Sequence, residues 1–352
     1  MMRVPHNRLT HGNEEVDKVA ALIAGGRWSS GYETEMLEYE LSRYTRREFT
    51  TVVGSGLGAI RLALLSLDIG SGDEVIIPAY SCVALANAIL ACGAKPVVSD
   101  IKEKSWILNP DCVRSVVNSR SKAIILVHTF GYPADADSLR SLGVPLIEDC
   151  AHGLDNCEMG NTADIAVTSF YSTKLIGAGE GGAVMSNEKK IDKFVKQWRS
   201  YVDQSPSASR LNDKITELSA ALARVQLERL PWMVKQRTAL AERYSDKLAL
   251  LFNENYLHPP LKKENRIWYR YCVEIVKSKA VYWKNALYDR GIDTELPIWD
   301  WRNSDCLYKN MKAPITDHAY DCILSLPLYP ALTEEEQDKV IEEINDVANV
   351  LS

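Results

Sequence analysis

The first half of the chain alternates between short apolar runs and segments with helical spacing. The apolar runs cover residues 51–53, 74–77, 96–99, 123–127 and 144–147. Runs of this length, bounded by glycine, proline or aspartate, are typical of strands. Because their apolar character is unbroken, they predict an α/β fold with a mostly parallel sheet sandwiched by helices. Ligands of such sheets bind at the carboxyl ends of the strands, so we expect the functional residues in the loops there.

Three helices are predicted from capping signals and spacing. An apolar stripe over residues 60–67 follows the glycine-rich turn at residues 54–58, so a helix N-terminus faces that turn. Ser81 is the expected N-cap of a second helix, which ends at Gly93. Residues 333–336 form a capping box before a C-terminal helix. The acidic run there is therefore a solvated helix face and not a binding tail.

The second half of the chain predicts a smaller C-terminal α+β domain. A long helical stretch from about residue 216 to 250 precedes a strand-like segment at residues 269–276. We place the boundary near Pro231, which gives a large domain of residues 1–231 that includes the N-terminal segment, and a small domain of residues 232–352.

Composition and charge exclude several classes of protein. Hydrophobic residues make up 46% and charged residues 25% of the 352 residues, as in a soluble globular protein with a sizeable core. Lys and Arg number 41 and Asp and Glu 47, so the net charge is 41 − 47 = −6 and gives nucleic acid or anionic lipid no general basic field. We expect no nucleic-acid partner. Any bound anion must then be held locally.

No apolar run reaches the length of a membrane span, and residues 1–7 are too polar for a signal peptide. We therefore expect a cytoplasmic protein without a membrane partner. The eight cysteines are scattered, with no C-x-x-C pair and no histidine at zinc-ligand spacing. We expect reduced thiols and no metal site.

The glycine-rich turn has two possible functions. Residues 54–59, GSGLGA, satisfy the G-x-G-x-x-A pattern of dinucleotide-binding proteins, which would indicate a dehydrogenase. That pattern also requires an acidic residue at the end of the next strand, whereas Asp73 and Glu74 stand at its start. What remains is a strand–turn–helix unit that can bind a phosphate through backbone N–H groups, or a tight turn without a ligand.

A second set of polar residues follows later strands. Asp149 ends an apolar strand, and Lys174 follows the hydroxyl-rich segment 168–173 and precedes a glycine-rich stretch at residues 177–182. A turn-forming aspartate and a solvated lysine are the alternatives. Together with the turn at residues 54–58, however, this arrangement suggests a Schiff base between a lysine and an aldehyde cofactor whose phosphate binds close by.

The ordered set of motifs resembles the DegT/DnrJ/StrS family of pyridoxal-phosphate-dependent (fold type I) nucleotide-sugar aminotransferases. The resemblance covers nearly the whole chain. Its motifs are residues 26–31, 55–56, 72–78, 93–97, 127–131, 148–149 and 169–174, then Asn212 before residues 220–221 and 226–227, and finally residues 325–330.

The resemblance assigns the chemistry to three residues. Lys174 would be the Schiff-base lysine, holding pyridoxal 5'-phosphate as an internal aldimine and later moving a proton. Asp149 would pair with the pyridine nitrogen and keep it protonated. His152 matches a Gln-or-His position beside the 3-oxygen of the cofactor.

The resemblance also implies how the phosphate is bound. Ser169 would give its hydroxyl, and Ser55, Gly56 and Leu57 would give backbone amides at the helix start. Asn212 matches an Asn that reaches the phosphate of the neighbouring subunit, so the resemblance implies a homodimer with shared active sites.

The chain departs from the family pattern at several positions. Leu57 stands where many relatives have a threonine, and Cys82 where an aromatic ring usually stacks on the cofactor, a function that Tyr80 or another ring would have to take over. Residues 268–271 lack a frequent histidine, and residues 297–301 replace a loop that often carries His and Tyr. For the acceptor, the candidate contacts are Arg27, Trp28, Tyr80, Tyr329 and the loop at residues 299–301.

The resemblance implies an aminotransferase that converts a keto group of a nucleotide-linked sugar to an amine, with glutamate as donor. A cyclitol or aminoshikimate-type acceptor stays open, as does a sugar dehydratase of the same fold, although that branch has histidine at the lysine position. A non-catalytic binding or regulatory protein is the alternative from another class, which Leu57 and Cys82 would favour.

Overall fold

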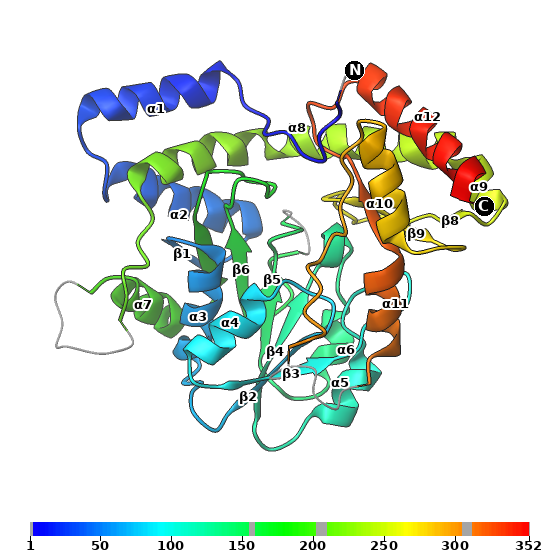
Figure 1. Ribbon diagram of the computed structural model, residues 1–352. Helices are drawn as coiled ribbons and strands as arrows, with labels where there is room; N and C mark the ends of the chain where they lie inside the picture. The colour runs from blue at the N-terminus through cyan, green and yellow to red at the C-terminus, as the bar shows by residue number, and fades with distance from the viewer. Residues whose placement is uncertain (1–2, 155–158, 202–209, 305–311, 352) are drawn as a thin grey trace.

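The computed structural model describes residues 3–154, 159–201, 210–304 and 312–351, and within them a seven-stranded sheet forms the centre of the fold (Figure 1). The strand order across the sheet is β1-β7-β6-β5-β4-β2-β3. The strands are β1 (Phe49–Val53), β2 (Glu74–Pro78), β3 (Lys95–Ser99), β4 (Ser121–Val127), β5 (Leu146–Asp149), β6 (Ile165–Ser169) and β7 (Gly182–Ser186).

The sheet is mostly parallel, as expected. Strands β2 to β6 pair in parallel, and β7 runs antiparallel to both of its neighbours, β1 and β6. All five expected strands are present. Strand β5 starts at Leu146 rather than at residue 144, because Pro145 has no N–H to donate to the ladder, and it extends to Asp149.

Helices cover both faces of the sheet, which explains the unbroken apolar strands (Figure 1). In β4, Ile125 and Val127 belong to one core with the helices α3 (Gly56–Ser66), α4 (Ala84–Ala91) and α7 (Lys189–Trp198). The alternate residues Ile124 and Leu126 pack with α5 (Pro110–Val116) and α6 (Ala136–Arg140). Helices α2 (Tyr32–Thr45) and α8 (Glu217–Lys247) share a further core with β1, β6 and β7. Helix α1 (Asn13–Gly25) packs on α8.

The helix predicted after the glycine-rich turn and the capping box at residues 333–336 are confirmed. The side chain of Ser55 accepts a hydrogen bond from the Gly58 N–H at 3.0 Å and starts α3. The capping box joins Thr333 and Glu336 at the start of α12 (Glu334–Leu351). The prediction for Ser81 is wrong: its hydroxyl donates to the carbonyl of Pro78 at 2.8 Å, and α4 starts only at Ala84.

The C-terminal part contains a three-stranded antiparallel sheet in the order β10-β9-β8 within the described residues. Its elements are α9 (Ala249–Asn253), β8 (Leu257–His258), β9 (Tyr271–Ile275), α10 (Ala280–Asp289), α11 (Pro314–Cys322) and β10 (Ile323–Leu326). Strand β9 is shorter than the expected 269–276. Helix α8 is continuous through Pro231, and the division into residues 1–231 and 232–352 stays a prediction.

Two further expectations concern membrane-spanning helices and the cysteines. Within the described ranges, no helix combines the length and the apolar character that a membrane crossing requires. The six described cysteines are free thiols, and the expectation for Cys157 and Cys306 lies outside the described residues.

Candidate active site

A cavity of about 400 Å³ lies at the carboxyl ends of β4, β5 and β6 and at the start of α3. This is where a parallel sheet offers a binding site, because the strands end and the chain diverges into loops. Nine of the residues predicted from the sequence line it together: Ser55, Gly56, Leu57, Tyr80, Cys82, Asp149, His152, Ser169 and Lys174.

The start of α3 forms a cradle that fits a phosphate. Among the described residues, the N–H groups of Gly56 and Leu57 have no hydrogen-bond partner, as expected for the first turn of a helix. A Cβ added to Gly56 would lie 2.7 Å from the Cβ of Ser169, so the helix start and the end of β6 are packed against each other here. The free N–H groups, the helix dipole and the Ser169 hydroxyl therefore lie together where an anion such as a phosphate would fit.

Asp149 is suited to pair with a cationic ring nitrogen. It is 9% exposed, and among the described residues only the N–H of Ala151 bonds its carboxylate, at 2.9 Å. Burial raises the pKa of Asp149, while the Ala151 N–H and the charge of Lys174 oppose that rise. A protonated pyridine nitrogen beside this carboxylate would give it a cationic partner and a second hydrogen bond.

His152 is a neutral hydrogen-bond donor toward the cavity. The N–H of Phe130 donates to its Nδ1 at 3.4 Å, so the proton of the neutral ring is on Nε2. Burial, and then the charge of Lys174, holds the pKa of His152 well below its ordinary value. The ring stacks on Tyr269 at a centroid distance of 4.4 Å. Sequence reasoning did not find Tyr269 as a site residue; the missing family histidine in residues 268–271 was the available signal.

Lys174 lies in the loop after β6, where two cavities meet. It lines the 400 Å³ cavity and a second cavity of about 320 Å³ that extends toward α8. Its Nζ is 5.2 Å from the centre of the Tyr269 ring, and its backbone N–H donates to the carbonyl of Tyr171. The amine is therefore accessible from the same cavity as Asp149 and His152.

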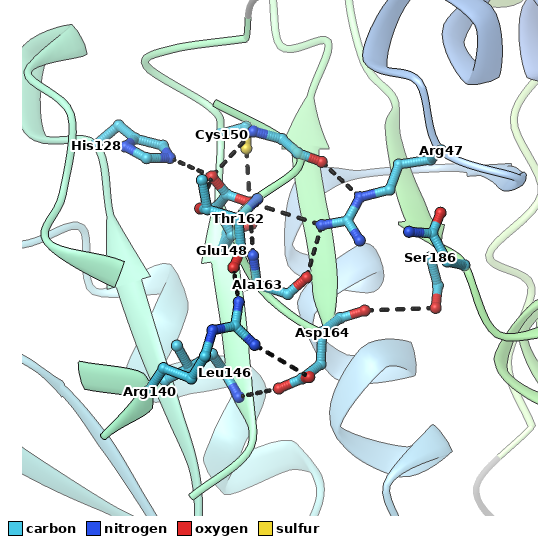
Figure 2. Close-up of polar contacts among 12 residues, drawn as sticks. Arg47, His128, Arg140, Leu146, Glu148, Cys150, Thr162, Ala163, Asp164 and Ser186 are labelled. Atoms are coloured by element: carbon cyan, nitrogen blue, oxygen red, sulfur yellow. Dashed lines mark hydrogen bonds and ion pairs between the residues drawn. The ribbon is translucent and has the colours of Figure 1, made fainter. Parts of the chain in front are cut away.

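A buried network on the other side of β5 holds the strand that carries Asp149 (Figure 2). Glu148 is fully buried, and its carboxylate contacts the Nε2 of His128 at 2.7 Å and accepts from the N–H of Gly160 and the hydroxyl of Thr162. Burial by itself would raise the pKa of Glu148, but these partners lower it to about 2. The guanidinium of Arg47 lies 3.8 Å away.

Three residues of this network are of types that can coordinate a metal ion, and they lie close together. Atoms of His128, Glu148 and Cys150 lie within 4.8 Å of one another. Both oxygens of Glu148 are already bonded, since Thr162 and Ala163 also donate their N–H groups to Oε2. The carboxylate is thus satisfied by hydrogen bonds, and the network explains why Glu148 precedes Asp149: it joins β5 to residues 160–163.

Tyr80 lines the cavity, and its use as a substitute stacking ring stays a prediction. Tyr80 is buried and packs edge-on against Phe130 and Tyr320, at interplanar angles of 84° and 77°. Cys82 is exposed and lines the cavity. In the loop at residues 299–301, Trp299 is 83% exposed and lines the cavity mouth, whereas Trp301 is buried and donates its Nε1–H to the carbonyl of Ser81.

Four predicted residues lie outside this cavity in the single chain. Arg27 and Trp28 are exposed between α1 and α2, and Asn212 is exposed between α7 and α8. Tyr329 is completely buried, and its hydroxyl has no hydrogen-bond partner in the part of the chain that the structure describes. Of the candidate acceptor contacts, Tyr80 and Trp299 therefore line the cavity, whereas Arg27, Trp28 and Tyr329 do not.

Comparisons with known proteins agree with this geometry. The sequence model of the DegT/DnrJ/EryC1/StrS aminotransferase family matches residues 10–345. The 3-oxo-glucose-6-phosphate:glutamate aminotransferase of Bacillus subtilis (strain 168) is 29% identical, over 96% of this chain and 82% of that protein. The dTDP-3-amino-3,4,6-trideoxy-alpha-D-glucose transaminase of Micromonospora megalomicea subsp. nigra is 32% identical, over 94% of each.

Solved structures show the same fold. The crystal structure of ntda from Bacillus subtilis with bound cofactor PMP superposes with a TM-score of 0.91 at 28% identity, covering 99% of this chain and 86% of that chain. S. venezuelae DesV in complex with ketimine intermediate has a TM-score of 0.90 at 28% identity, covering 99% of both. Since the family model matches nearly the whole chain and the relatives are aminotransferases, the chain belongs to the DegT/DnrJ/EryC1/StrS aminotransferase family and is a pyridoxal-phosphate-dependent aminotransferase.

Proposed function

We propose that this enzyme transfers the amino group of glutamate to a keto group on a nucleotide-linked sugar, with Lys174 as the residue that binds the cofactor covalently. The observation that carries the proposal is the convergence of Lys174, Asp149 and His152 on the cavity that also contains the cradle at the start of α3. A solvated lysine or a turn-forming aspartate would not require these groups to meet.

Each residue has a distinct function in this proposal. The bound cofactor supplies an electron sink for the negative charge that develops when a substrate carbon loses its proton. Asp149 keeps the ring nitrogen protonated, and the Nε2–H of His152 donates to the ring oxygen. The Nζ of Lys174 takes up and returns the proton at the substrate carbon. Ser169 and the amides of the helix start bind the phosphate.

The names of the relatives support a sugar as acceptor. One relative acts, by its name, on 3-oxo-glucose-6-phosphate with glutamate, and the other is named for a dTDP-linked aminosugar. The first name makes a sugar phosphate the second candidate acceptor. Tyr80 is the proposed acceptor contact within the chain, because it lines the cavity. Tyr329 is buried, so we expect it to act through packing and not by contacting the acceptor.

The proposal includes a cytoplasmic homodimer with shared active sites. Arg27, Trp28 and Asn212 are exposed and away from the cavity of their own chain, which suits residues that complete the site of a neighbouring subunit. Asn212 then reaches the partner's cofactor phosphate, and Arg27 and Trp28 its acceptor.

The visible absorption spectrum of the protein tests this proposal. Addition of pyridoxal phosphate to the purified protein should produce a band of the bound cofactor, and glutamate should convert it to the pyridoxamine form. Lys174→Ala should abolish turnover while the fold remains, and Lys190→Ala, which changes an exposed lysine paired with Glu188, should behave as the wild type. A band that ignores glutamate would contradict the donor, and no band would favour a binding protein.

A further inference from the structure

The wall of the cavity that the C-terminal part provides carries an arginine that forms no ion pair with any described residue. Arg270 directly precedes β9 and lines the cavity together with Asp149 and Lys174. Its Nη1 contacts the Nε2 of His6 at 3.2 Å and the hydroxyl of Ser325 at 3.4 Å. Its Nε is buried without a partner, and its Nη2 has no hydrogen bond to any described residue. One edge of the guanidinium is therefore held in place, and the other is unoccupied.

A second buried arginine lies behind the first. Arg237 on α8 is 6% exposed, and its Nη1 donates to the carbonyls of Tyr269 and Leu328 at 3.0 and 2.8 Å. Arg237 and Arg270 both line a small cavity of about 50 Å³ beside the main one. Within the described ranges neither arginine forms an ion pair. Glu180 also lines the main cavity, but its exposed carboxylate pairs with neither arginine.

Two neighbouring groups respond to this positive charge. Burial, followed by the charges of Arg270, Lys284 and Arg237, lowers the pKa of His6 to about 3. Burial alone would raise the pKa of Tyr269, yet its pKa is lowered, because Lys174 and Arg270 favour the phenolate. A region of positive potential thus surrounds the unoccupied edge of Arg270. Uncompensated charge of this kind is costly in a folded protein unless a ligand neutralises it.

We propose that Arg270 binds an anionic group of the substrate, a carboxylate or a phosphate, through its free Nε and Nη2 edge, while Arg237 adds positive charge from behind. The inference rests on the proposed function, because it concerns what the aminotransferase cavity admits. Two adjacent N–H donors of a guanidinium match two oxygens of a carboxylate or phosphate, a geometry that a lysine cannot reproduce. This subsite belongs to the C-terminal part, whereas the cradle at Gly56 and Ser169 belongs to the large sheet.

His6 and Ser325 are positioning residues for this subsite. His6 stays neutral at neutral pH because of its low pKa, so its Nε2 can accept the Nη1–H of Arg270 instead of repelling the guanidinium. Ser325 lies on β10 and accepts from the same nitrogen. Three segments distant in the sequence therefore set the direction of the free edge.

The experiment uses the holoenzyme and two substitutions at one position. Arg270→Leu removes the charge, Arg270→Lys keeps it without the paired donors, and Arg114→Leu changes an exposed arginine paired with Asp111 as a control. Glutamate is titrated against the cofactor band, and unreactive glutarate and inorganic phosphate are titrated by calorimetry. Arg270→Leu should weaken glutamate or phosphate binding by roughly 10- to 100-fold, the effect of a lost charge-assisted hydrogen-bond pair. Arg270→Lys should be intermediate, and Arg114→Leu unchanged.

The three ligand titrations distinguish whether the anion belongs to the amino donor or to the acceptor. Weaker glutamate and glutarate binding assigns the subsite to the amino donor, and weaker phosphate binding alone assigns it to a phosphorylated acceptor; both outcomes support the proposal. Unchanged binding of all three ligands, or loss of pyridoxal phosphate from Arg270→Leu, would overturn it. If wild-type enzyme does not react with glutamate, the proposed donor fails, while the calorimetric titrations still test Arg270.

Discussion

Gly56 and Ser169 come so close together that a Cβ on Gly56 would lie 2.7 Å from the Cβ of Ser169. Gly56 is the first residue of α3, and Ser169 is the last residue of β6. The contact lets the first free N–H groups of the helix and the Ser169 hydroxyl face the same point. Glycine is needed here for close approach and not for a left-handed backbone.

Gly56→Ala should therefore weaken cofactor binding more than it affects the fold. Since Cβ–Cβ contacts at this distance do not occur in proteins, either α3 or Ser169 must move, and the cradle opens. We expect the dissociation constant for pyridoxal phosphate to rise at least about 10-fold, equal to roughly 1.4 kcal/mol. Fluorescence or absorbance titration measures it. Gly25→Ala, where a Cβ has nothing within 4 Å, is the control, and equal affinities in both variants would contradict the cradle.

Gly131→Ala should displace the segment that carries Tyr269. Gly131 has φ +82°, and a Cβ there would lie 1.7 Å from the carbonyl oxygen of Ile267, whose N–H donates to the Gly131 carbonyl. Tyr269 then loses its position against His152. Gly72→Ala shares the positive φ of +92° but has open space, so it reports backbone strain alone, roughly 1–2 kcal/mol.

Thermal unfolding and absorbance of the bound cofactor distinguish the two glycine variants. We expect Gly131→Ala to lower the melting temperature further than Gly72→Ala and to change the cofactor spectrum, which Gly72→Ala should leave intact. A common shift in both variants would mean that residues 267–269 do not depend on Gly131.

Glu148→Ala should destabilise the protein strongly at neutral pH. The substitution leaves Arg47 and His128 buried without their carboxylate, a loss of roughly 3–5 kcal/mol in unfolding free energy. Because the folded pKa of Glu148, about 2, lies below its ordinary 4.5, the charged form stabilises the fold above pH 4.5, and this contribution is lost as the pH falls toward 2. The difference in unfolding free energy between the wild type and Glu148→Ala should therefore become smaller between pH 4.5 and pH 2.

Chemical denaturation at several pH values measures this gap. Glu188→Ala changes an exposed carboxylate paired with Lys190 and should cost little at any pH. A Glu148→Ala variant as stable as Glu188→Ala would show that the network of Figure 2 contributes nothing to stability.

His6 should contribute to acid instability. The unfolded chain binds a proton at His6 below the ordinary pKa of 6.5, whereas the folded protein does so only near 3. Stability is therefore lost as the pH falls from 6.5 toward 3, by about 1.4 kcal/mol per pH unit for one group. His6→Asn should reduce the slope of unfolding free energy against pH by about one proton between pH 4 and 6. An unchanged slope in His6→Asn would contradict this expectation.

The local sequence carried enough information to predict the large sheet and to select nine residues that line one cavity. Unbroken apolar runs indicate strands buried on both faces, and polar residues after such runs must lie at one edge of a parallel sheet. Asp149, Lys174 and the turn at residues 54–58 could be recognised for this reason. Ser81 shows the limit of local signals: its hydroxyl found a carbonyl three residues earlier and so did not cap α4.

The sequence did not predict the residues on the opposite wall of the cavity. Tyr269 and Arg270 line the same cavity as His152 and Lys174. The N–H of Ile267 donates to the carbonyl of Gly131, and Arg237 on α8 donates to the carbonyl of Tyr269. The contacts of Gly131 with Ile267 and of His152 with Tyr269 join segments more than 100 residues apart. Arg237 and Tyr269 are 32 residues apart, and no spacing rule connects any of these pairs. Chain periodicity reports which face of an element is buried, but which elements meet depends on the packing of the whole fold. Short sequence motifs were therefore enough to predict the residues on the wall with Asp149 and Lys174. The residues on the opposite wall, Tyr269 and Arg270, are brought to the cavity only by tertiary contacts.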